Sequence, residues 1–139
     1  MLSKIIQLFH SIITVLTVIF PYIYIKYDLY YMIYVSFTVV HWLLLKGECI
    51  LTYLEKKTLD PNYKLGSDPY RSPFYTVLGS STMKLIKTIY LINILFIIYR
   101  NWNTNHLYPI IFLTIMMIIV NIIITKIYPG HVLPERVAS

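Results

Sequence analysis

Two histidines and a glutamate are the residues best placed for chemistry, because they lie near the ends of long uncharged segments. His10 follows closely on Lys4, and His41 shortly precedes Lys46. If the two segments are antiparallel helices, both imidazoles lie at a similar depth. Glu48 follows His41 by about two helical turns on the same face, so the three side chains can line a polar pocket. Histidine titrates near neutral pH, and intramembrane His and Glu side chains often mark proton or ion paths.

Other polar residues extend these faces. Thr52 continues the face of His41 and Glu48, and Asn93 and Asn121 belong to polar faces of later segments. Unpaired polar groups are costly in hydrocarbon, so such faces are expected to turn inward. One interpretation is that they hold helices together through hydrogen bonds. The other is a ligand or proton pathway made of His10, His41, Glu48, Thr52, Asn93 and Asn121.

Cysteine and metal chemistry have little support in this sequence. Cys49 is the only cysteine, which excludes an intramolecular disulfide and a Cys-x-x-Cys pair. It is expected where a helix leaves the membrane, as a small buried apolar residue or as a site of palmitoylation. Two histidines and one carboxylate are a thin ligand set, so we predict no metal site and no cofactor.

Basic residues follow the cysteine and suggest contact with lipid headgroups. Lys56, Lys57, Lys64 and Arg71 are candidates for binding anionic headgroups, at about 1 kcal/mol for each charge. The simpler interpretation is that these charges only fix the orientation of the chain in the membrane.

The stretch CILTYLE contains a short recognisable pattern. Cys49, Leu51, Thr52 and Glu55 match a Cys-Pro-Leu-Thr-x-x-Glu signature, with Ile50 in place of the proline. In this the stretch resembles a bacterial family of small multi-span membrane proteins of unknown function, in which the signature follows a transmembrane helix. The resemblance implies a small helical membrane protein and transfers no activity.

The composition of the chain indicates that membrane helices position these candidate residues. With 58% hydrophobic and 13% charged residues, the chain is too apolar for an ordinary soluble domain, and its 14 tyrosines suit a membrane interface. We predict one all-α domain, an integral membrane bundle of four transmembrane helices. The expected helices cover about 5–25, 29–57, 82–99 and 106–126, with a cytosolic loop at 58–81 and an extended tail at 127–139.

Charge predicts the orientation of this bundle. Of the 12 Lys and Arg residues, only Lys26 and Arg100 fall in the two turns expected on the side opposite the termini. Positive charge concentrates on the cytosolic side of membrane proteins, so both termini are expected in the cytosol. Residue usage rich in isoleucine, asparagine, lysine and tyrosine also indicates an AT-rich gene, as in large DNA viruses and in some parasites and bacteria.

Three functions are compatible with this architecture. The leading hypothesis is a non-enzymatic membrane protein that acts through assembly or scaffolding in a cellular or viral membrane. The alternative is a small proton or ion channel or transporter that uses His10, His41 and Glu48. An enzyme acting on lipids has the least support. The expected partners are the lipid bilayer, anionic headgroups and a second copy or another membrane protein, and not nucleic acid.

Overall fold

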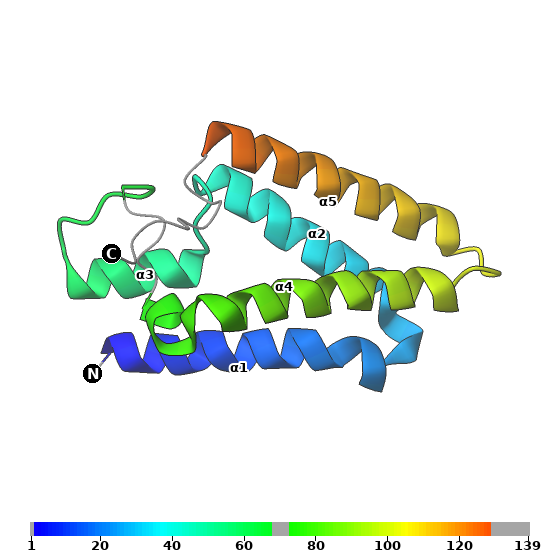
Figure 1. The fold of residues 1–139 in the computed structure, drawn as a ribbon, viewed down its shortest axis with the longest axis horizontal. Coiled ribbons are helices and arrows are strands. Elements are labelled where there is room, and N and C mark those ends of the chain that lie inside the picture. The colour runs from blue at the N-terminus through cyan, green and yellow to red at the C-terminus, as the bar shows by residue number, and fades with distance from the viewer. Residues whose placement is uncertain (1, 68–72, 129–139) are drawn as a thin grey trace.

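The computed structural model describes residues 2–67 and 73–128, and this part of the chain is all-helical (Figure 1). Its elements are α1 (Leu2–Ile23), the 3-10 turn η1 (Ile25–Tyr27), α2 (Asp28–Leu44), α3 (Ile50–Leu59), α4 (Pro73–Arg100) and α5 (Leu107–Ile127). Helix α1 packs beside α4, and α2 packs beside α5. The turns 24–28 and 101–106 lie at one end of the bundle, which we call the turn end. The start of α1, helix α3 and the end of α5 lie at the other, the terminus end.

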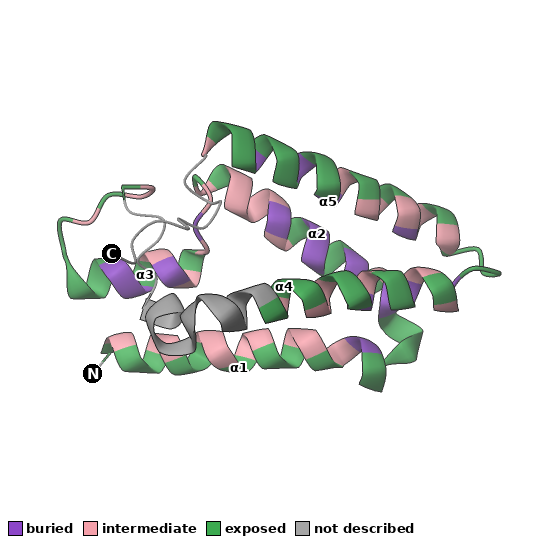
Figure 2. Ribbon diagram, in the orientation of Figure 1, coloured by how far each residue is buried: buried purple, intermediate pink, exposed green. Residues whose placement is uncertain are grey.

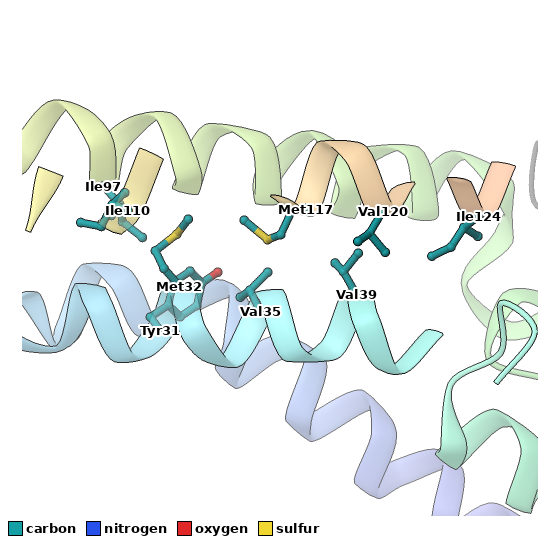
Figure 3. Packing of buried hydrophobic residues seen from close by; sticks show 9 residues of the cluster. All are labelled: Tyr31, Met32, Val35, Val39, Ile97, Ile110, Met117, Val120 and Ile124. Carbon is teal, nitrogen blue, oxygen red and sulfur yellow. The ribbon is translucent and has the colours of Figure 1, made fainter. Parts of the chain in front are cut away.

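The apolar core lies mainly between α2 and α5. Met32, Val35 and Val39 recur on α2 at spacings of three and four residues, which places them on one face. They face a matching set on α5, with one further residue from α4 (Figure 3). The whole buried cluster consists of Tyr31, Met32, Val35, Val39, Ile97, Ile110, Met117, Val120 and Ile124.

The outward faces of α1 and α5 are apolar and exposed (Figure 2). Both helices are long and apolar enough to cross a membrane, with mean hydropathies of 1.8 and 2.6. Only 11% of the most apolar window of α1 and 17% of that of α5 is buried within the protein. An apolar helix in the core of a soluble protein is mostly buried, whereas little of either of these two helices is buried.

The expected continuous helix over 29–57 is wrong, because it breaks at Leu45–Cys49. Lys46 and Gly47 have φ angles of 52° and 85°, in the left-handed region that cannot continue a right-handed helix. The Gly47 N–H donates to the Trp42 carbonyl at 2.6 Å, which closes the last turn of α2. A new helix, α3, then begins at Ile50.

The connection after α3 is shorter than the expected loop at 58–81. Helix α4 begins at Pro73 and runs for 28 residues, so it includes residues that the sequence assigned to the loop. Proline suits the first position of a helix because its missing N–H has no partner there in any case. Helices α1 and α5 cover the first and fourth expected ranges to within a few residues, and most of the expected tail lies outside the described residues.

Candidate functional site

The most strongly bonded polar cluster lies at the turn end and joins the two turns. Arg100 donates from Nε to Oδ2 of Asp28 at 2.7 Å, and from a terminal nitrogen to Oδ1, which makes a two-pronged ion pair. The other terminal nitrogen donates to the Pro21 carbonyl at 2.9 Å. Asn101 Nδ2 donates to the same Asp28 Oδ2 at 2.6 Å. Asp28 is only 4% exposed, so every bond to it replaces water.

Helix ends explain why these residues meet. Asp28 begins α2 and Arg100 ends α4, so each charge also opposes the partial charge of its own helix end. The guanidinium lies 5.0 Å from the centre of the Phe96 ring, which adds a cation–π contact. The sequence predicted only a role in orientation for Arg100, and the pair with Asp28 was not predicted. The signal was present, since an acid and a base stand in the two short turns expected on the same side.

A second polar contact lies within the bundle, between α1 and α4. Asn93 is fully buried and donates from Nδ2 to the Val18 carbonyl at 2.9 Å. Its Oδ1 accepts a hydrogen bond from the Tyr22 hydroxyl at 2.7 Å. The amide therefore turns inward, as expected, and joins two helices through both of its polar atoms.

The third cluster lies at the terminus end and is built by Glu48, Lys56 and Tyr63. Lys56 Nζ donates to Glu48 Oε1 at 3.3 Å and to the Tyr63 hydroxyl at 3.1 Å. The Tyr63 hydroxyl in turn donates to Glu48 Oε1, and the ammonium lies 5.0 Å from the centre of the Tyr63 ring. Glu48 and Lys56 are both buried. The cluster thus fixes α3 to the break before it and to the segment after it.

Thr52 and Glu55 lie on the same buried side of α3. Glu55 is 1% exposed, and its Oε2 has no hydrogen-bond partner among the described residues. Burial raises the pKa of the Glu55 carboxyl, and the neighbouring Lys56 lowers it in part. One oxygen of Glu48, Oε2, is also buried without a partner in the described part of the chain.

The hydrogen bonds of His41 and Asn121 run to groups outside the set of candidate pathway residues. His41 Nε2 accepts a hydrogen bond from the Ile50 N–H at 3.3 Å, so it satisfies the first amide of α3. His10 is half-buried on α1. Asn121 is exposed on α5, where its Nδ2 donates to the Met117 carbonyl of its own helix at 3.1 Å. The expectation that the polar face of Asn121 turns inward is therefore wrong.

The basic candidates for headgroup binding are also used differently. Lys56 is buried against Glu48, so it is not a surface charge. Lys57 donates to the carbonyls of Pro61 and Tyr63, which closes the segment after α3. Lys64 is exposed, and Arg71 lies outside the described residues. The Cys49 thiol is half-buried just before α3.

The first two clusters join helices to one another, and the third joins α3 to the segments on either side of it. Among residues 2–67 and 73–128, no group of three or more His, Cys, Asp or Glu side chains is arranged to hold a metal ion. Comparison of the chain with family models, curated proteins and solved structures gives no match.

Proposed function

We propose that this chain is a small multi-pass membrane protein, with α1, α2, α4 and α5 crossing the bilayer and both termini on one side. It acts through assembly, as a structural or scaffolding component that binds copies of itself or another membrane protein. The observation that carries the proposal is the exposure of the apolar outer faces of α1 and α5. Both faces are suited to contact with lipid or with the helices of a partner, and both are poorly suited to contact with water.

The internal contacts of α1 support its role as a permanent span rather than a cleaved signal segment. The carbonyls of Val18 and Pro21 accept hydrogen bonds from Asn93 and Arg100 of α4. Removal of α1 would take these acceptors away from Asn93 Nδ2 and from one terminal nitrogen of Arg100, at a cost of about 1–3 kcal/mol for each polar atom left unpaired. Helix α2 has 17 residues, a length of about 25 Å, and is covered on one face by α5.

The polar residues support an architectural role over catalysis. Asn93, the Asp28–Arg100 pair and the Glu48–Lys56–Tyr63 cluster each join separate segments of the chain. Interhelical hydrogen bonds of this kind stabilise membrane bundles by about 0.6–2 kcal/mol each. The short resemblance at Cys49–Glu55 agrees with a small helical membrane protein and adds no activity.

Crosslinking in the membrane tests the assembly proposal. The protein is reconstituted at several lipid-to-protein ratios, treated with a membrane-permeable crosslinker and separated by size in denaturing detergent. Assembly predicts a discrete oligomer, or a discrete complex with a partner when native membranes are used, that persists as lipid is added. Adducts that disappear on dilution with lipid, with no partner in native membranes, would mean that the outer faces contact lipid alone.

Proton or ion conduction is the second candidate, favoured by the buried, unpartnered oxygens of Glu48 and Glu55. Its test is pH-dependent flux into liposomes by wild-type protein, with Glu48→Gln and His41→Ala as the variants expected to lose it. Glu48→Gln retains the size of the side chain while removing its charge. Absence of flux from wild type under imposed proton and potassium gradients would exclude conduction and leave assembly as the function.

A further inference from the structure

Six exposed aromatic side chains gather at the turn end of the bundle. They come from the turn between α1 and α2, the start of α2, the end of α4, the turn after α4 and the start of α5, which the chain brings to one end (Figure 1). We call them the aromatic belt, and their exposed fractions run from 49% for Tyr27 to 80% for Tyr108. The belt consists of Tyr24, Tyr27, Tyr30, Tyr99, Trp102 and Tyr108.

The polar atoms of the belt are available to an external partner. None of its five tyrosine hydroxyls makes a hydrogen bond within the described part of the chain, in contrast to the hydroxyl of Tyr22, which binds Asn93. For such a side chain, exposure of the ring is unfavourable in bulk water, and an unpaired hydroxyl is unfavourable in hydrocarbon. They suit a layer that is apolar on one side and wet on the other.

Charge at the turn end favours the same environment. Asp28 is the only acidic residue in the segments that carry the belt, and it is buried against Arg100 and Asn101. Lys26 is exposed there, so the accessible formal charge of this end is positive. The buried pair removes the one carboxylate that would repel phosphate headgroups, and it also joins the two turns.

We propose that the aromatic belt lies in the headgroup layer of a lipid bilayer and fixes the depth of the bundle in the membrane. This inference rests on the proposed membrane-spanning function, and it adds that the turn end of the bundle lies in the headgroup layer. The rings take the lipid interface as their partner, with each hydroxyl or indole N–H toward the headgroups and each ring toward the acyl chains. Trp102 lies in the turn between α4 and α5, and is therefore a natural reporter of this depth.

Tryptophan quenching tests the placement directly. The chain has two tryptophans, so Trp42→Phe leaves Trp102 as the only one. The variant is placed in vesicles of phosphatidylcholine brominated either near the ester end or near the methyl end of the acyl chain, and iodide is added separately as an aqueous quencher. The belt predicts strongest loss of Trp102 fluorescence with bromine near the ester end, and weaker loss with the other two quenchers.

Other outcomes separate this inference from the proposed function. Strong quenching by iodide alone, in a protein that resists alkaline extraction from the vesicles, would place the turn in water and overturn the belt while leaving the membrane spans intact. Strongest quenching by bromine near the methyl end would also overturn it. Release of the protein by alkaline extraction would overturn both proposals. If Trp42→Phe fails to fold, the difference in fluorescence quenching between wild type and Trp102→Phe reports the depth of Trp102 instead.

Discussion

At the scale of single residues, Asp28 and Arg100 carry the most consequential contact. Asp28→Asn leaves the Arg100 guanidinium without its carboxylate in a largely buried place, and the expected loss in unfolding free energy is about 3 kcal/mol. Thermal unfolding in detergent, followed by circular dichroism, measures it. The double variant Asp28→Asn, Arg100→Gln leaves no unpaired charge, so it is expected to lose less than the two single variants together. A loss equal to their sum would mean that the two residues act independently.

Glu55 gives a prediction about pH at the same scale. Burial raises the pKa of its carboxyl above the ordinary value of 4.5, so the folded protein holds the proton more tightly than the unfolded chain. The resulting stability is present below about pH 4.5 and is lost as the pH rises through the folded pKa. The unfolding temperature of wild type should therefore fall relative to that of Glu55→Gln as pH rises. Parallel profiles for the two proteins would contradict a raised pKa.

The break between α2 and α3 decides the geometry at the scale of elements. Gly47 has a φ of 85°, so Gly47→Ala is expected to destabilise the fold by about 1–2 kcal/mol. Lys46 has a φ of 52°, and Lys46→Gly is the matched control, expected to be neutral or stabilising because glycine adopts this conformation without strain. Unfolding by denaturant compares the two. A stabilising Gly47→Ala would indicate that α2 and α3 form one continuous helix.

The same element shows what the sequence can and cannot predict. Periodicity located α1, α2, α4 and α5, because long apolar segments bounded by charges leave few alternatives. It also carried the helix through Lys46 and Gly47, since a single glycine within a helical pattern is usually tolerated. At the break, Glu48 bonds to Lys56 and to Tyr63 of the following segment, and helical spacing does not predict these contacts. Asp28 and Arg100 lie even further apart in sequence, and although the expected turns place both on one side, only the fold shows that they are in contact.

At the scale of the whole molecule, the number of crossings remains a prediction, and cysteine labelling tests it. In a Cys49→Ser background, single cysteines are placed by Ser3→Cys, Asn62→Cys and Asn103→Cys, and a membrane-impermeant maleimide is added to one side of the vesicles at a time. Four crossings place residues 3 and 62 on one side and residue 103 on the other. If only the two most apolar helices, α1 and α5, cross, residues 62 and 103 share a side opposite residue 3. The side on which Asn62→Cys is labelled therefore decides between the two arrangements. With four crossings, α2 and α4 lie within the lipid beside α5 and α1. With two crossings, α2 and α4 lie at the membrane surface.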